Sequence, residues 1–333
     1  MRYRTLGTSG LRVSDLVLGA MTFGEQGGVG APVEECRRIL DAYAEAGGNT
    51  IDTAINYRAG ASEEILGQLL AGRRESFVLG SKYTVSRDRT DPNAGGNARK
   101  NLRASLETSL RRLNTDYLDV YWVHMWDRGT PIEETMRALD DAVRAGKILY
   151  VGISDAPAWV VAQANTLAAW RGWSPFIGLQ VPYSLLQRDI ERELLPMAEA
   201  FGLGVTTWSP LAGGVLSGKY APTAEATGST RLDPASVDEH AHAVARTVHE
   251  VADERGATPA QVAIAWTMAR SPAIRPIIGA RRADQLRDNL GALDVRLSAE
   301  ECARLEAATD FAPGFPTEFI AQTSPWVFGA ALV

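Results

Sequence analysis

Cysteine and histidine are both scarce in this chain of 333 residues, and their scarcity argues against two kinds of site. The two cysteines, Cys36 and Cys302, lie in segments with a helical pattern, so we predict neither a disulfide framework nor a cysteine metal site. Three of the four histidines fall within residues 240–249 without the i, i+4 spacing of a zinc pair. We therefore expect no bound metal, and only His124 needs another explanation.

Long apolar runs and an excess of positive charge are also missing. No apolar run approaches the roughly 20 residues of a membrane-spanning helix, and residues 1–5 contain no apolar signal core. The net charge of -6 and the pI near 5.4 argue against nucleic acid or an anionic membrane as the main partner. With 45% hydrophobic and 22% charged residues, we expect a soluble, cytoplasmic globular protein.

What the chain does have is a regular alternation of short apolar segments with amphipathic ones. The segments expected to be strands are 16–20, the segment ending at Asp52, 77–83, 117–124, 148–154, 176–181, 204–208 and 273–278. Helical segments separate them; in residues 97–113, for example, leucines recur at a helical period. A small hairpin over residues 1–13 precedes the first strand, and extra helices are expected at 237–254 and 259–269. This order predicts an α/β fold, a (β/α)8 TIM barrel forming a single domain over residues 1–333.

Three successive predicted strands end in ionisable residues. These are Asp52, Lys82 and His124, and Tyr57 lies in the loop just beyond the first of them. In a parallel barrel the carboxyl ends of the strands meet at one face, so these four side chains are expected to lie together. Each could be explained singly, as a turn cap, a loop aromatic, a surface lysine or a core histidine. Four at equivalent positions are much harder to explain by packing.

Two nucleotide-binding patterns are incomplete. Residues 213–220 are similar to a phosphate-binding P-loop, but they lack the final Ser or Thr that would hold magnesium. The segment after them is also expected to be coil, whereas a P-loop leads into a helix. No G-x-G-x-x-G follows a strand, which argues against a Rossmann dinucleotide site. The glycines and the lysine of residues 213–220 still suit a loop that wraps a diphosphate.

The order and spacing of Asp52, Tyr57, Lys82 and His124 resemble the catalytic tetrad of the aldo-keto reductases. The resemblance runs from the N-terminal hairpin to the last capped helix, and it is closest to the bacterial and potassium-channel β-subunit branch because of Trp208 and the glycine-rich segment after it. It implies that a nicotinamide cofactor is held by Gly19, Ala20, Met21, Ser154, Asp155, Gln180, Trp208, Ser209, Pro210, Leu211, Gly213, Ser217, Lys219, Arg231, Gly279, Arg281, Arg282, Gln285, Asp288 and Asn289. Asp155 stands where the family usually has asparagine, which removes an amide donor at that contact.

The resemblance implies NADPH-dependent reduction of an aldehyde or ketone to an alcohol. Arg281 and Arg282 at a helix start suit a 2′-phosphate, which favours NADPH over NADH. Tyr57 is then the proton donor, Lys82 lowers its pKa, and Asp52 keeps Lys82 charged. His124 orients the substrate carbonyl.

Further expectations concern the substrate pocket, the tail and alternative functions. The pocket is expected to include Met21, Tyr83, Met125, Trp126 and Trp326. The irregular, aromatic tail over residues 311–333 is expected to form either a lid over the active site or a packing or subunit contact. Two alternatives stay open: an NADPH-binding regulatory subunit, and a Schiff-base aldolase that uses Lys82 as nucleophile.

Overall fold

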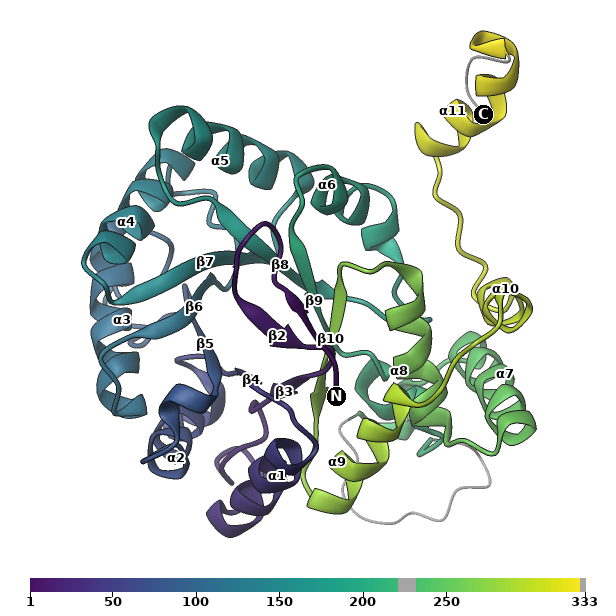
Figure 1. The fold of residues 1–333 in the computed structure, drawn as a ribbon, viewed down its shortest axis with the longest axis horizontal. Coiled ribbons are helices and arrows are strands. Elements are labelled where there is room, and N and C mark those ends of the chain that lie inside the picture. Colours follow the sequence, from purple (N-terminus) through teal and green to yellow (C-terminus); the bar gives the residue numbers. More distant parts are fainter. Residues whose placement is uncertain (221–231, 330–333) are drawn as a thin grey trace.

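The computed structural model describes residues 1–220 and 232–329. Eight parallel strands close into a barrel in the order β10-β3-β4-β5-β6-β7-β8-β9 (Figure 1). They are β3 (Val17–Gly19), β4 (Thr50–Asp52), β5 (Val78–Tyr83), β6 (Leu118–Val123), β7 (Ile148–Ser154), β8 (Phe176–Pro182), β9 (Gly204–Trp208) and β10 (Ile274–Gly279). The predicted (β/α)8 barrel is confirmed, because each predicted strand overlaps an observed one.

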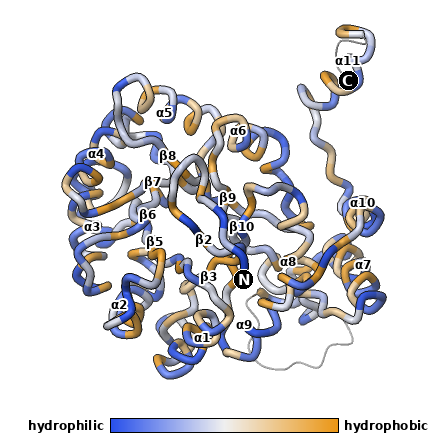
Figure 2. The backbone as a smooth tube through the Cα atoms, in the orientation of Figure 1, coloured by the Kyte–Doolittle hydropathy of each residue, from blue (hydrophilic) through white to orange (hydrophobic). Residues whose placement is uncertain are grey.

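Helices surround the barrel and bury one face against it. In α4 the side chains of Met136 and Leu139, spaced i, i+3, are fully buried. Figure 2 shows hydrophobic and hydrophilic stretches along the same surrounding helices. The helices are α1 (Val33–Glu45), α2 (Ala61–Leu69), α3 (Arg99–Leu113), α4 (Ile132–Arg144), α5 (Ala158–Arg171), α6 (Leu194–Ala200), α7 (Glu239–Arg255), α8 (Pro259–Arg270), α9 (Ala283–Leu290), α10 (Ala299–Ala307) and α11 (Thr317–Val327). Among the described residues, no helix combines the length and the apolar character needed to cross a membrane.

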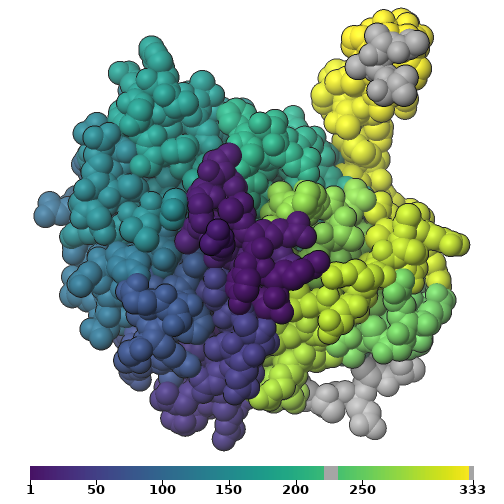
Figure 3. Space-filling view, in the orientation of Figure 1, coloured from purple at the N-terminus to yellow at the C-terminus, as the bar shows by residue number. Residues whose placement is uncertain are grey.

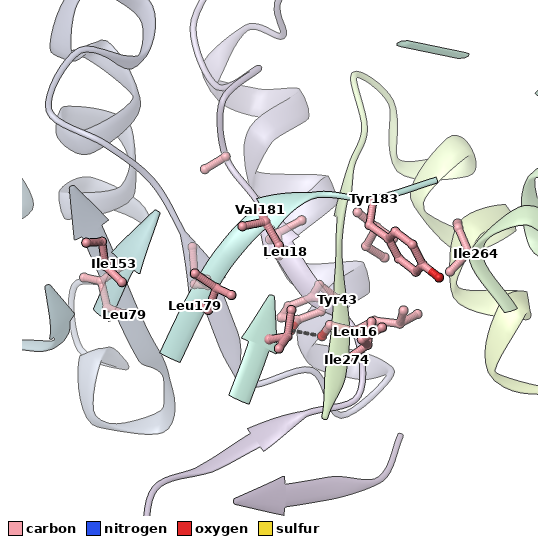
Figure 4. Packing of buried hydrophobic residues seen from close by; sticks show 14 of the residues in the cluster. Leu16, Leu18, Tyr43, Leu79, Ile153, Leu179, Val181, Tyr183, Ile264 and Ile274 are labelled. Carbon is pink, nitrogen blue, oxygen red and sulfur yellow. Dashed lines mark hydrogen bonds between the residues drawn. The ribbon is translucent and has the colours of Figure 1, made fainter. Parts of the chain in front are cut away.

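The layer between barrel and helices is held by apolar packing and a few buried hydrogen bonds (Figure 4). The Tyr43 hydroxyl of α1 lies 2.8 Å from the carbonyl oxygens of Leu16 and Thr50. These carbonyls stand at the starts of β3 and β4, so this one hydroxyl ties α1 to the entry of both strands. This hydroxyl therefore fixes the amino-terminal ends of the two strands.

The amino-terminal end of the barrel is closed by the predicted hairpin, which the structure confirms as β1 (Tyr3–Thr5) and β2 (Arg12–Ser14). It lies across the middle of one face of the molecule (Figure 3). Behind it, Leu6 and Val13 pack with Trp122 inside the barrel.

Glycines make room for the Trp122 indole. A Cβ at Gly152 would lie 2.3 Å from a Trp122 ring carbon, and one at Gly178 would lie 2.7 Å from another. Contacts under 3.0 Å would force the indole to move, so both positions need glycine. The indole lies between the hairpin and the carboxyl ends of the strands.

The tail differs from its predicted form. Residues 311–314 have no regular structure and 315–316 form a turn, but α11 follows and projects away from the barrel (Figure 1). Phe315 in the turn before α11 and Phe319 within the helix bring their ring centroids to 6.1 Å. Trp326 is 74% exposed. The predictions of an irregular tail and of Trp326 as a pocket wall are therefore wrong, and the structure does not place this segment as a lid.

Candidate active site

Side chains alternate between the barrel interior and the surrounding helices along each strand, and this alternation places the predicted site residues. Successive side chains of a strand point to opposite faces, so Lys82 in β5 faces the barrel interior and Tyr83 faces the helices. Tyr83 is fully buried there and stacks on Tyr121 of β6, with ring centroids 5.4 Å apart. The prediction of Tyr83 as a substrate-pocket residue is therefore corrected. It had assigned two consecutive residues of one strand to the same face.

Lys82 stands at the centre of a hydrogen-bonded chain. Its buried Nζ donates to Asp52 Oδ2 at 2.5 Å, to the Thr53 carbonyl oxygen at 2.8 Å and to the Tyr57 hydroxyl oxygen at 3.0 Å. These three bonds use all the ammonium protons. Nζ also lies 4.6 Å from the centroid of the Tyr57 ring. Three of the four predicted catalytic residues thus form one continuous contact.

The backbone that places Tyr57 is strained. Tyr57 begins a short 3-10 turn, and the next two residues, Arg58 and Ala59, have φ of 51° and 54°. Such left-handed conformations cost on the order of 1 kcal/mol or more for a non-glycine residue. Arg58 holds the turn by donating to the carbonyl oxygens of Met21 and Gln26, at 3.1 and 2.8 Å. Arg58 is not among the predicted site residues, because nothing in its local sequence pattern distinguishes it from a surface arginine.

The pKa values of this buried chain follow from burial and from the neighbouring charges. Burial raises the pKa of Tyr57; the Lys82 charge opposes this and the Asp52 charge adds to it, so the pKa stays above its ordinary value. Lys82 therefore acts in the predicted direction, but burial outweighs it. For Lys82 itself, burial alone would lower the pKa, yet the charges of Asp52 and Tyr57 raise it. Lys82 is an ammonium and Tyr57 a neutral phenol at neutral pH.

His124 completes the predicted tetrad from the end of β6. Its ring meets the Tyr57 ring edge-on, with centroids 5.9 Å apart. Its backbone N–H donates to Thr84 Oγ1 at 3.2 Å, and its buried Nδ1 has no hydrogen-bond partner among the described residues. Burial, and then the Lys82 charge, lower the pKa of His124 to about 3. The neutral ring can therefore hydrogen-bond a substrate oxygen without bringing a second positive charge into the site.

This depressed pKa predicts a pH dependence of stability. Below pH 6.5 the unfolded chain binds a proton at His124 that the folded chain, with a pKa of about 3, does not bind. Stability is then lost as the pH falls, with a slope of up to about 1.4 kcal/mol per pH unit from this one group. We expect urea unfolding between pH 7 and pH 5 to show a shallower slope for His124→Gln than for the wild type. The exposed His240→Gln is the control, and equal slopes for wild type and His124→Gln would contradict the prediction.

Residues at the ends of β7, β8 and β9 surround the tetrad. Gln180 Nε2 donates to Asp52 Oδ1 at 3.0 Å, so its amide supports the carboxylate, a contact that the cofactor prediction did not foresee. Asp155 has φ 46° and accepts a hydrogen bond from Trp208 Nε1 at 3.2 Å. Burial raises the pKa of Asp155, although this hydrogen bond and one from Ser154 oppose it. Asp155 therefore positions Trp208, whose side chain is 37% exposed at the mouth.

A cleft extends from this mouth between the segment after β9 and the start of α9. Ten predicted cofactor residues line it: Ser209, Pro210, Leu211, Gly213, Ser217, Lys219, Gly279, Arg281, Gln285 and Asn289. Thr22 and Val29, on the loop after β3, line it too and were not predicted individually. The sequence indicated only that this loop is rich in glycine. The cleft and the tetrad thus occupy the same end of the barrel.

Positive charge gathers in the cleft. Burial, followed by the charges of Arg281 and Arg282, lowers the pKa of Lys219. Arg282 is mostly exposed, and its Nε lies 3.0 Å from Asp284 Oδ1. Such a cluster of cations suits phosphate groups.

The predicted cofactor residue Asp288 does not line the cleft. Asp288 accepts from Gln261 Nε2 at 3.0 Å and from Thr258 Oγ1 at 3.2 Å, so it braces the capped start of α8. This corrects its assignment as a cofactor contact. Arg231 lies outside the described residues.

The remaining pocket predictions lie at the rim. Met125 is 53% exposed, and Trp126 is partly buried with its ring edge-on to Trp159 of α5, at a centroid distance of 5.5 Å. The Arg128 guanidinium lies 5.4 Å from the Trp126 ring centroid. Met21 is partly buried on the loop after β3, which carries Gly19 and Ala20 at the strand end. An aromatic rim therefore adjoins His124.

Comparison with known proteins agrees with this geometry. The model of the aldo/keto reductase family matches residues 15–310. Norsolorinic acid reductase stcV of Emericella nidulans is 40% identical over 325 residues, which cover 95% of this chain and 83% of that protein. Aryl-alcohol dehydrogenase GME11368 of Pestalotiopsis microspora is 37% identical over 329 residues, covering 96% and 85%. Aldo-keto reductase ausK of Emericella nidulans is 35% identical over 357 residues, covering 98% and 90%. This chain forms a barrel with the tetrad at its strand ends and is matched along nearly its whole length. It therefore belongs to the aldo/keto reductase family.

Proposed function

We propose that this chain reduces an aryl aldehyde or ketone to the alcohol with NADPH, in the cytoplasm. The observation that carries the proposal is the buried hydrogen-bonded chain of Asp52, Lys82 and Tyr57, which ends beside a neutral His124. The aryl preference is supported by the aromatic rim formed by Trp126 and Trp159. The names of two relatives, an aryl-alcohol dehydrogenase and a norsolorinic acid reductase, point the same way.

The cleft fits a dinucleotide in the chemistry of its donors. Lys219 and Arg281 bring positive charge for phosphates, and Gly213 and Gly214 have φ of 69° and 103°, conformations that favour glycine and let the backbone approach a ligand. Gln285 and Asn289 add amide groups at the same end. When bound, NADPH supplies the hydride that reduces the carbonyl carbon.

The residues of the tetrad supply the proton and the orientation. Tyr57, kept neutral because burial raises its pKa, donates its hydroxyl proton to the carbonyl oxygen. Lys82 stabilises the phenolate that remains, and Asp52, supported by Gln180, keeps Lys82 charged and in place. The neutral His124 hydrogen-bonds the same oxygen and turns the carbonyl toward Tyr57.

The two alternative functions have less support. A Schiff-base aldolase needs a free amine, but the pKa of Lys82 is raised and its Nζ donates three hydrogen bonds. The regulatory-subunit alternative, and the channel-subunit branch behind it, rest on the sequence resemblance alone. The three relatives named above are fungal proteins with enzyme names.

The test of this function measures NADPH and NADH consumption by the purified protein with matched aryl and alkyl aldehydes and ketones. We expect aryl carbonyl compounds to be reduced with NADPH at the higher kcat/KM. The double variant Arg281→Ala/Arg282→Ala should raise the Kd for NADPH by at least about tenfold and change that for NADH far less, because charge-assisted contacts to the 2′-phosphate are lost. Fluorescence titration measures both constants.

The control for this titration is Arg287→Ala, which removes one positive charge at an exposed position of α9. It should leave both cofactor constants unchanged. Equal weakening of NADPH and NADH in the double variant would show that these arginines do not distinguish the phosphate. A protein that binds NADPH but reduces none of the carbonyl compounds would overturn the proposed activity.

A further inference from the structure

An open cavity lies at the amino-terminal end of the barrel, away from the tetrad. It is bounded by the first residues of the chain, the end of α8, the start of β10 and the segment 295–297. Figure 1 shows the N-terminus beside β10 and α8 on the hairpin side of the molecule. Four arginines line the cavity, together with a single acidic residue: Arg2, Arg4, Arg275, Arg296 and Asp15.

The charges in this cavity do not balance. Asp15 is buried and is approached by the Nε atoms of Arg2 at 3.1 Å, Arg4 at 3.4 Å and Arg275 at 3.7 Å. One carboxylate therefore faces three guanidinium groups, and Arg296 at the rim makes no ion pair with the described residues. The excess is at least two positive charges, which the two negative charges of a phosphate dianion would balance.

Arg275 gives the strongest indication that the cavity binds an anion. It is 5% exposed, and its Nη1 donates to the carbonyl oxygens of Pro272 and Ile274 at 2.8 and 2.6 Å. Its buried Nε has no hydrogen-bond partner within the described part of the chain. A buried donor without a partner is costly, and more so on a charged group. Burial, aided by the charges of Arg4 and Arg2, lowers the pKa of Arg275 although Asp15 opposes this.

We propose that this cavity is a second, non-catalytic site that binds an oxyanion of the phosphate class through Arg275, Arg2 and Arg4. Guanidinium groups match phosphate oxygens with two parallel N–H donors each, and the cavity offers several such groups around one space. Asp15 lies at the Nε edges of Arg2 and Arg4 and leaves their terminal nitrogens for the ligand, and the Nε of Arg275, which makes no hydrogen bond with the described residues, is a further donor. Because Arg2 and Arg4 belong to the hairpin and Arg275 to β10, the bound anion fastens the hairpin to the barrel and stabilises the fold.

Thermal unfolding and calorimetric titration of the purified full chain test this site, with inorganic phosphate and ribose 5-phosphate as probes. Sodium chloride at matched ionic strength corrects for general salt effects. We expect a saturable rise in Tm with phosphate. Tighter binding of ribose 5-phosphate would identify a phosphorylated metabolite as the ligand, and binding of inorganic phosphate alone would identify the free ion. The response must persist in Arg281→Ala, which removes an anion contact from the cofactor cleft.

Two variants connect the response to the cavity. Arg275→Gln and Arg4→Gln should each raise the Kd for phosphate by about tenfold or more, since each removes a charge-assisted contact. Arg4 is 45% exposed, so Arg4→Gln keeps the proposal testable if Arg275→Gln fails to fold. Arg246→Gln, an exposed change of equal charge on α7, should bind phosphate as the wild type does. The site is disproved if phosphate gives no saturable response, or if both cavity variants respond as Arg246→Gln does.

Discussion

Tyr57→Phe should remain folded and lose carbonyl reduction by at least ~100-fold, the scale of general acid catalysis. The phenol oxygen accepts a hydrogen bond from Lys82 Nζ at 3.0 Å, and its ring packs edge-on against His124. The substitution removes the only proton that the tyrosine can donate, while the ring that packs on His124 stays. Steady-state kcat and the Kd for NADPH measure the two effects, and the Kd should hardly change.

A matched substitution controls for the loss of a buried tyrosine hydroxyl. Tyr121→Phe removes a fully buried hydroxyl from the layer that faces the helices, where the ring stacks on Tyr83. It should leave kcat at the wild-type value. Turnover by Tyr57→Phe within a few-fold of that control would remove Tyr57 from the proposed mechanism.

Lys82→Met should damage both stability and activity. Lys82 is fully buried, and its removal leaves the Asp52 carboxylate, 7% exposed, with the Gln180 amide as its remaining side-chain partner. Breaking a buried ion pair from one side costs about 3–5 kcal/mol, because an uncompensated charge stays in the interior. Turnover should fall by about 100-fold or more, since the charge that stabilises the Tyr57 phenolate is lost.

The double variant Lys82→Met/Asp52→Asn separates these two losses. It removes both charges, so most of the lost unfolding free energy should return, while turnover stays as low as in Lys82→Met. Urea unfolding and the reductase assay on the single and double variants measure this cycle. If the double variant is no more stable than Lys82→Met, the buried charge is not the cause of the instability; if it regains turnover, Lys82 is not needed for the chemistry.

The placement of Asp52, Tyr57, Lys82 and His124 at one end of the barrel was predictable because its signals are local. Each member ends a short apolar strand or follows it closely, and a parallel barrel brings all strand ends to one face. Tyr83 also ends a strand, but it directly follows Lys82, so strand alternation turns it to the opposite face, toward the helices. The prediction for Trp326 was wrong for another reason. A helix with few close partners, such as α11, can point in many directions, and its sequence does not specify which direction it takes.

The cofactor predictions show the limit of a resemblance. The glycine-rich segment after β9 and the start of α9 meet in one cleft, as expected. Gln180 and Asp288 make hydrogen bonds within the protein, to Asp52 and to the start of α8, which the resemblance did not predict. A family pattern identifies the position of such a residue, but the partner of its side chain depends on what packs beside it here.

The sequence by itself determined the alternation of strands and helices, the barrel, and the positions of the tetrad at the strand ends. These follow from periods of two and 3.6 residues and from short-range capping, which depend on near neighbours. Only the tertiary structure decided that burial outweighs Lys82 at Tyr57, that Gln180 supports Asp52, and that Arg2, Asp15 and Arg275 share one cavity. Such contacts join residues up to 260 positions apart, and barrel closure, rather than any local pattern, sets their distances and their exposure to water.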